Sequence, residues 1–358
     1  MYSVKKIENT EEKEKSSYYF FETKDYVTSV DGEWKIASEK IKGSKILHRA
    51  VAIPVKEQNS FGAKNVYSFF VVRKEYSPFP VYFHSTFKLN EHRDEIVEKE
   101  NPKTINRFIA RELLSYYVEK VKEHFLTPEF GDYAMQLLTP NGFEIKDGCC
   151  EIRESFFKDF NLLNEYVEKI RSIKFIYTVN NEFISDSPEV INCEEIPNLF
   201  KAPYFERLID SDMERADRVL PFLRKYFGLR DLTPEEICKR INEMAPSLID
   251  DSVKRMSLFY WWKESVCKTY FEEERKDEIY YPNIVKTDAQ CLTNDVKNCY
   301  LTGGAVQEPP KWATITVIDP KDEENLSILY AEKINKIKRY YESFPKKIRL
   351  LLNEYCLD

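Results

Sequence analysis

The spacing of apolar residues changes near residue 100, from every second residue to every third or fourth. Before that point, short aromatic and β-branched runs separated by polar turns predict strands at 18–22, 34–37, 46–55, 66–73 and 81–89. After it, apolar residues at helical spacing predict a helix of about 25 residues, with Asn101 as N-cap, Pro102 at its first position and an end at Thr127-Pro128. A sheet followed by one long amphipathic helix predicts an α+β unit over 17–128.

In the rest of the chain, sequence patterns typical of strands alternate with patterns typical of helices. Residues 1–16 are a charged leader, and 129–200 is a mixed segment with a helix at 155–172 and a β-hairpin at 174–192. Residues 201–275 are predicted helical, with helices at 210–227 and 252–271 and, between them, one that a capping box opens at Thr233. Residues 276–358 are expected to carry a second hairpin at 281–297 and a closing helical stretch. With one two-residue gap, the two hairpins align at an offset of 108 residues, which fits either a weak internal repeat or chance similarity over a short window. The whole is therefore predicted to be of the α+β class.

Composition excludes several functional classes. Only nine glycines occur, with no GxGxxG or GxxxxGK[ST], which excludes dinucleotide-binding and P-loop folds. A net charge of −7 argues against a dedicated duplex-binding domain. Eight cysteines form no CxxC and none lies near the four histidines at ligand spacing, so we expect neither a metal site nor disulfides. No apolar run is long enough to span a membrane, so we expect a cytoplasmic protein without membrane contact.

Two stretches are candidate interaction surfaces. The run Phe259–Tyr260–Trp261–Trp262 could form an aromatic platform, but its plainer interpretation is that two of the side chains are core and two are buried against a neighbouring segment or partner. The stretch 333–349 is the one basic patch in an acidic chain, and its plainer interpretation is a solvated helix face. The candidate interaction residues are Trp261, Trp262, Trp312, Lys338, Arg339, Lys346 and Lys347.

The most informative local stretch is 79–94, FPVYFHSTFKLNEHRD. His84 lies within the predicted strand, and Arg93 follows the end of that strand just before the long helix. Taken alone, these residues fit an ordinary sheet histidine and a surface cation.

The same stretch resembles a segment of sacsin-like proteins, whose N-terminal ATPase is similar to that of the ninety-kilodalton heat-shock chaperones, the GHKL class. In that family, the strand just downstream of the nucleotide pocket has the form Pro-hydrophobic-x-hydrophobic-His-x-x-Phe-x-Leu, followed by a polar stretch and an Arg. The matching positions here are Pro80, Val81, Phe83, His84, Phe87, Leu89 and Arg93. The runs 51–55 and 66–72, the two hairpins and the Pro-x-Trp at 310–312 resemble further family segments in the family's order.

The resemblance implies a transducer-like unit without the ATP pocket, because the chain has no DxGxG loop and too few glycines for a lid. ATP and Mg²⁺ would belong to a missing upstream domain, and no cofactor is expected in this chain. Arg93, with His84 as its neighbour, is then the candidate residue that reaches the γ-phosphate. The implied partners are the N-terminal GHKL ATPase domain and a protein client, and nucleic acid is not favoured. The implied function is non-catalytic coupling and interaction.

Two alternatives remain at this stage. A metal-dependent nuclease could use Asp319, Asp322 and Glu323 with the basic stretch that begins at Lys333. A free-standing interaction protein would differ from the first interpretation only in whether the reading frame begins at Met1.

Overall fold

The chain divides into two compact units. The first comprises residues 1–192 and 206–231, and the second comprises 193–205 and 232–358. The computed structural model describes residues 18–55, 64–99, 101, 103–141, 143–146, 149–152, 155–191, 197–200, 203–213, 216–267, 282–287, 291–293, 299–300, 316–317, 319, 321–322, 324–325 and 328. Among these residues, no helix combines the length and apolar character needed to cross a membrane. Both units contain helices and strands, which confirms the α+β class.

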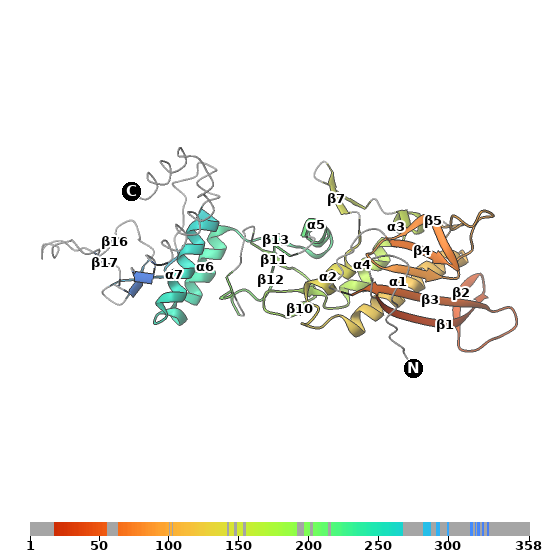
Figure 1. Ribbon diagram of the computed structural model, residues 1–358, viewed down its shortest axis with the longest axis horizontal. Helices are drawn as coiled ribbons and strands as arrows, with labels where there is room; N and C mark the ends of the chain where they lie inside the picture. Colours follow the sequence, from red (N-terminus) through yellow and green to blue (C-terminus); the bar gives the residue numbers. More distant parts are fainter. Residues whose placement is uncertain are drawn as a thin grey trace, which may run out of the picture. The chain divides into compact units, whose positions relative to one another are not determined.

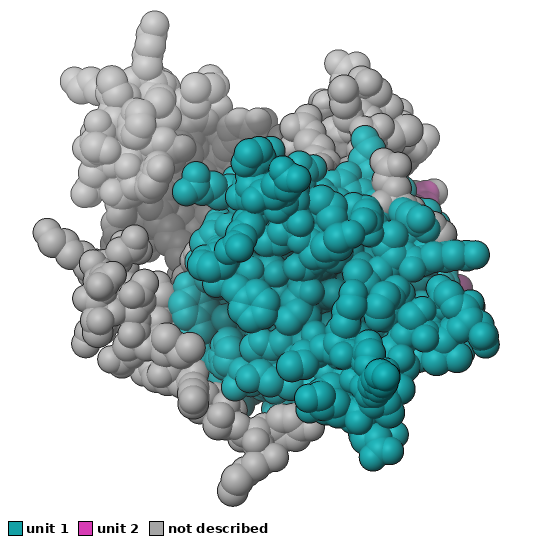
Figure 2. Space-filling view, turned by 90° about the vertical axis from the view of Figure 1, so that its right-hand side faces the viewer, with its two compact units in different colours: residues 1–192, 206–231 teal, residues 193–205, 232–358 magenta. Residues whose placement is uncertain are grey.

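A six-stranded sheet forms the strand-rich end of the first unit (Figure 1), whose described residues are teal in Figure 2. Its strand order is β2-β1-β3-β6-β4-β5, and all neighbours are antiparallel except β4 and β6. The strands are β1 (Tyr18–Val30), β2 (Glu33–Ala37), β3 (Lys45–Pro54), β4 (Lys64–Ser68), β5 (Phe70–Ser77) and β6 (Tyr82–Ser85).

Alternation along the strands gives this sheet two different faces. Phe21, Val51 and Phe83 stand opposite one another on β1, β3 and β6, and all are buried. The helix α1 (Ile105–His124) covers this face and lies beside β3 (Figure 1). The predicted apolar stripe of the helix is confirmed, since Phe108, Leu113 and Tyr117 are among its buried residues. The opposite face carries Glu22, His48 and His84, which become important below.

The predicted start of the long helix and the predicted strand at 66–73 are both wrong. The long helix is capped by Thr104, whose side chain accepts the Arg107 N–H, and not by Asn101. Asn101 instead accepts the Lys103 N–H in a turn before the helix. The single strand expected at 66–73 is two strands, because the chain reverses at Phe69, whose φ is 62°.

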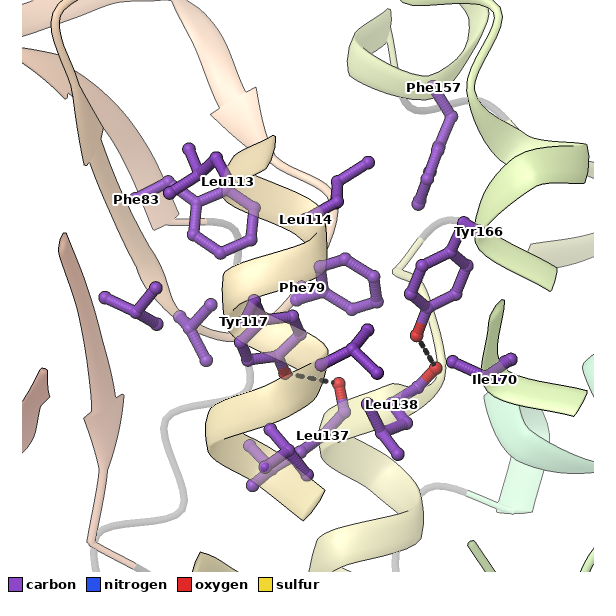
Figure 3. Packing of buried hydrophobic residues seen from close by; sticks show 14 of the residues in the cluster. Phe79, Phe83, Leu113, Leu114, Tyr117, Leu137, Leu138, Phe157, Tyr166 and Ile170 are labelled. Atoms are coloured by element: carbon purple, nitrogen blue, oxygen red, sulfur yellow. Dashed lines mark hydrogen bonds between the residues drawn. The ribbon is translucent and has the colours of Figure 1, made fainter. Parts of the chain in front are cut away.

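The core of the first unit continues through the domain boundary predicted at 128. The helices α2 (Asp132–Leu138), α3 (Ser155–Phe160) and α4 (Leu163–Arg171) pack their buried side chains into the cluster that also holds the sheet and α1. The one helix expected at 155–172 is broken at Asn161, which has a φ of 50°. Two buried tyrosines donate to backbone carbonyls of α2, Tyr117 to Leu137 and Tyr166 to Leu138 (Figure 3). Burial raises the pKa of both phenols, which keeps these hydroxyls protonated as donors.

The remaining elements are short strands and helices. In the first unit they are β7 (Phe143–Lys146), β8 (Cys149–Ile152), β9 (Ile176–Tyr177), β10 (Phe183–Ile184), β11 (Glu189–Val190), β12 (Leu208–Ile209), α5 (Ala216–Phe227) and β13 (Arg230–Asp231). In the second unit they are α6 (Pro234–Met244), η2 (Ala245–Leu248), α7 (Ser252–Trp261), η3 (Trp262–Cys267), β14 (Val285–Lys286), β15 (Leu292–Thr293), β16 (Cys299–Tyr300) and β17 (Thr316–Val317). The capping box predicted at Thr233 is confirmed, with Glu236 as its partner.

Both predicted hairpins form, and they share one pattern of hydrogen bonds. Thr178 donates its N–H and its hydroxyl to the Glu182 carbonyl at 2.9 and 3.2 Å, and Thr287 makes the same two bonds to Cys291 at 2.9 and 3.2 Å. In each unit an aspartate then accepts the N–H two residues on, Asp210 in the first and Asp319 in the second. The offset is 109 throughout (178 to 287, 182 to 291, 210 to 319), which corrects the predicted 108. The chain therefore contains the same small module twice.

Candidate functional site

Arg93 lies in a closed loop between β6 and α1, here called the Arg93 loop (residues 89–96). Leu89 and Ile96 pair at its base, and Asn90 donates its N–H to the Glu95 carbonyl at 3.0 Å. Arg93 donates its own N–H to the Asn90 carbonyl at 3.1 Å and has a φ of 58°. This left-handed backbone conformation is uncommon for residues other than glycine. The hydrogen bonds of the loop therefore hold the Arg93 backbone in a conformation that is unfavourable by itself.

A bulge in β5 holds the Arg93 loop in place. The β4–β5 register jumps between Asn65 and Val66, which leaves residues 73–75 of β5 without partners on β4. Lys74 of this bulge donates its N–H to the Asp94 carbonyl at 3.1 Å, and its ammonium lies 3.1 Å from the Asp94 carboxylate. The next residue, Glu75, accepts the Ile96 N–H at 3.4 Å. The loop is thus attached to the sheet at two positions that follow Arg93, Asp94 and Ile96.

Glu75 is itself a buried charge, with 1% of its side chain exposed. Burial raises the pKa of its carboxyl, and the Lys99 ammonium beside it opposes that shift. Lys99 also lies 3.0 Å from Asp159 of α3. This network connects the base of the loop to the helical part of the core.

The side chain of Arg93 is exposed, and its guanidinium carbon lies 5.8 Å from the ring centroid of Phe70. Within the described part of the chain, no carboxylate lies within ion-pair distance of this guanidinium. The loop therefore presents, on a fixed backbone, a cation that has no counter-ion among the described residues.

His84 belongs to a hydrogen-bonded chain across three neighbouring strands. Its Nε2 lies 3.2 Å from Nδ1 of His48 on β3, and Nε2 of His48 lies 3.2 Å from a carboxylate oxygen of Glu22 on β1. In the tautomer of His48 whose Nε2–H donates to the carboxylate, its Nδ1 accepts from His84 Nε2–H. Burial, and secondarily the neighbouring His48, lower the pKa of His84 below its ordinary value of 6.5. The lowered pKa favours the neutral form of the His84 imidazole.

The hydroxyl groups beside the Glu22–His48–His84 chain are engaged elsewhere. Ser85 donates to the His48 carbonyl at 2.6 Å, and Thr86 donates to the Ile46 carbonyl at 2.9 Å. Neither hydroxyl is directed to an imidazole, as a nucleophile would be. The hydrogen-bonded series Glu22–His48–His84 is therefore suited to holding the three strands together and to responding to pH. It is not arranged for hydrolysis through Ser85 or Thr86.

We expect thermal stability to fall as the pH is lowered from about 7.5 to about 5.5, because the unfolded chain binds a proton at His84 more readily than the folded chain does. The stabilisation that comes from neutral His84 is fully present above the pKa that this residue has in the unfolded chain. It is lost as the pH falls below that value towards the lower pKa of the folded chain. Thermal unfolding of the full chain, followed by circular dichroism across this range, measures the effect. His84→Gln should reduce the slope of Tm against pH, whereas His92→Gln, at an exposed loop position, should not. Equal slopes for the two variants would contradict this assignment.

The turn between β4 and β5 places two exposed phenylalanines, Phe69 and Phe70, next to His84 and Arg93 respectively. The Phe69 ring lies 5.9 Å from the His84 ring at an interplanar angle of 86°, while Phe70 lies beneath Arg93. Phe69 is 72% exposed and Phe70 is 58% exposed. We call these two residues the Phe69–Phe70 tip. Sequence reasoning missed it because the run SFFVV contains no glycine, proline or asparagine to mark a turn.

The other predicted interaction residues do not join this site. Trp261 and Trp262, named as candidate interaction residues, are 8% and 1% exposed, which favours the core alternative for both. Trp261 packs edge-on against Phe200 with ring centroids 4.9 Å apart. The remaining predicted residues lie outside the described part of the chain: Trp312, Lys338, Arg339, Lys346 and Lys347.

Asp319 and Asp322, the two described carboxylates of the nuclease alternative, do not form an open cluster. Asp322 is fully buried and pairs with Arg255, while Asp319 accepts the Lys321 N–H at 2.9 Å. Glu323 lies outside the described residues. Over the part of the chain that the structure describes, no group of three or more His, Cys, Asp or Glu side chains could hold a metal ion. Asp322 therefore has a structural role.

Comparison with protein-family models, with curated proteins and with solved structures finds no match to this chain.

Proposed function

We propose that this chain is the coupling and partner-binding part of a larger, cytoplasmic, ATP-driven protein of the sacsin-like, GHKL-associated kind. In this proposal, ATP and Mg²⁺ are held by another domain, and Arg93 contacts the nucleotide phosphates there. The chain itself is not the enzyme but completes the site and transmits nucleotide-dependent movement to a protein client.

The observation that carries the proposal is the way Arg93 is presented. An exposed arginine on a mobile loop would lose much of its binding energy to ordering, whereas the Arg93 loop is already ordered by Lys74, Asp94 and Glu75. A guanidinium that pairs with no carboxylate in the described part of the chain suits a phosphate, which it can contact through two parallel N–H groups. The sequence resemblance adds that an arginine stands at this position in the family motif.

We expect Arg93→Ala to lower the turnover number for ATP by about tenfold or more, as arginines that stabilise transferring phosphoryl groups do, with little change in ATP affinity. The assay uses the protein or complex in which this chain is joined to its nucleotide-binding domain. Arg93→Lys should recover part of the activity, because it keeps the charge but not the planar geometry.

Arg73→Ala is the matched control, since Arg73 is a second exposed arginine on the neighbouring strand β5. It should leave turnover within about twofold of the parent. An unchanged turnover in Arg93→Ala would refute the proposed role of this residue.

A further inference from the structure

We propose that the Phe69–Phe70 tip is the surface on which the nucleotide-holding domain docks, and that this contact positions Arg93 at the phosphates. This inference rests on the proposed function and adds the partner-binding surface to it. No feature of the sequence alone had indicated these two residues.

The exposure of the tip is the first observation. Phe69 and Phe70 are consecutive, and Val71, which follows them, is 39% exposed. Single exposed apolar side chains are normal on protein surfaces, but a contiguous group of large ones marks a contact surface. Aromatic side chains are also the usual anchors of protein interfaces, because they bury a large area with few rotatable bonds.

The backbone of the tip is the second observation. Phe69 alone occupies the turn between Ser68 and Phe70, which pair with each other, and its φ of 62° lies in the left-handed region. Glycine or asparagine would adopt this conformation at lower cost. A phenylalanine held there against its preference is best explained by a use for its side chain.

The rigidity of the tip is the third observation. Ser68 donates its hydroxyl to the Phe87 carbonyl at 3.1 Å, and Tyr67 pairs with Val71 directly below the turn. His84 supports the Phe69 ring from the adjacent strand. A surface that is ordered before binding loses little entropy when it docks.

The position of Arg93 beside the Phe69–Phe70 tip indicates which kind of surface the partner has. Since Arg93 lies over Phe70, the partner must present an anionic group next to an apolar surface that receives the two rings. A nucleotide-holding domain offers both, because bound phosphates supply the charge. Nucleic acid and anionic membranes also carry phosphates, but the net charge of −7 opposes both.

Photo-crosslinking identifies the occupant directly. The full chain is expressed in its native cells with p-benzoylphenylalanine in place of Phe70. The cells are then irradiated to form crosslinks. We expect the crosslinked peptide to come from a nucleotide-binding domain, with a yield that rises by about threefold or more with a non-hydrolysable ATP analogue. The control places the same residue at Tyr76, which is 44% exposed on the same strand, and should give no such product. Crosslinks to nucleic acid, to lipid or to an unrelated protein would overturn the inference.

Turnover measurements separate this inference from the proposed function. We expect Phe69→Ser/Phe70→Ser to lower ATP turnover by about fivefold or more without changing ATP affinity, and to add little when combined with Arg93→Ala. If Arg93→Ala lowers turnover and the double phenylalanine variant does not, the docking inference is refuted while the proposed function stands. If Arg93→Ala has no effect, the proposed function itself fails.

Discussion

Asp322→Ala is expected to lower the free energy of unfolding of the second unit by about 3–5 kcal/mol, because it leaves the buried Arg255 guanidinium without its counter-ion. Both side chains are almost completely buried, with 2% of Arg255 and none of Asp322 exposed. Asp322 also accepts the Ser252 hydroxyl at 2.6 Å and the Lys286 N–H at 2.8 Å. One carboxylate thereby connects the start of α7 to the strand β14, which lie more than thirty residues apart in the chain.

Urea denaturation of the full chain, followed by tryptophan fluorescence, measures this loss. Three of the four tryptophans belong to the second unit, so the signal reports mainly on that unit. Asp250→Ala is the control, since Asp250 is exposed, and it should change stability by about 0.5 kcal/mol or less. The double variant Arg255→Met/Asp322→Leu should be more stable than Asp322→Ala, because no unpaired charge remains. A loss below about 1 kcal/mol in Asp322→Ala would show that the pair is not important for folding.

Phe79→Ala is expected to destabilise the first unit by about 3–5 kcal/mol, the usual cost of removing a fully buried phenylalanine. Phe79 has no exposed surface and contacts four aromatic rings at centroid distances of 4.8 to 6.1 Å: Phe83, Tyr117, Phe157 and Tyr166. These rings come from β6, α1, α3 and α4, so the cavity would lie where the sheet meets the helices (Figure 3). Truncation should therefore weaken the whole unit and not a single element.

The control for Phe79→Ala is Phe70→Ala, which removes the same atoms from an exposed position. Its effect on stability should be about 0.5 kcal/mol or less. Both variants are compared with the parent by thermal unfolding, with far-ultraviolet circular dichroism to follow loss of the sheet and helices. Similar losses for the two positions would contradict the core assignment of Phe79.

The positions of the motif at 80–93 fall into a buried group and a group at or near the surface. Its apolar positions Val81, Phe83 and Phe87 are buried beside Phe79, so they serve packing. His84 and Arg93 are the polar positions that stay at the surface or near it. Function is therefore to be tested at these two residues and at the tip between them.

Local features of the fold could be predicted from the sequence. The alternation at 82–85, the apolar stripe of α1 and the capping box at Thr233 depend only on the period of the backbone and on hydrogen bonds within one turn. Both hairpins could be recognised for the same reason. Errors arose where a local choice depended on distant contacts, as at Asn101, where Thr104 caps the helix instead, and at Phe69, where the turn lacks any usual turn residue.

The class of the fold, most of its main elements, and the places of His84 within a strand and of Arg93 after that strand follow from short-range patterns in the chain. The surroundings of these two residues come from tertiary contacts. His84 meets His48 and Glu22 because β1, β3 and β6 are neighbours in a sheet whose order differs from the chain order. Arg93 meets Phe70 because the bulge of β5 holds the loop, and Asp322 meets Arg255 across 67 residues of chain. Such contacts depend on strand order and register, which no short-range pattern in a sequence encodes.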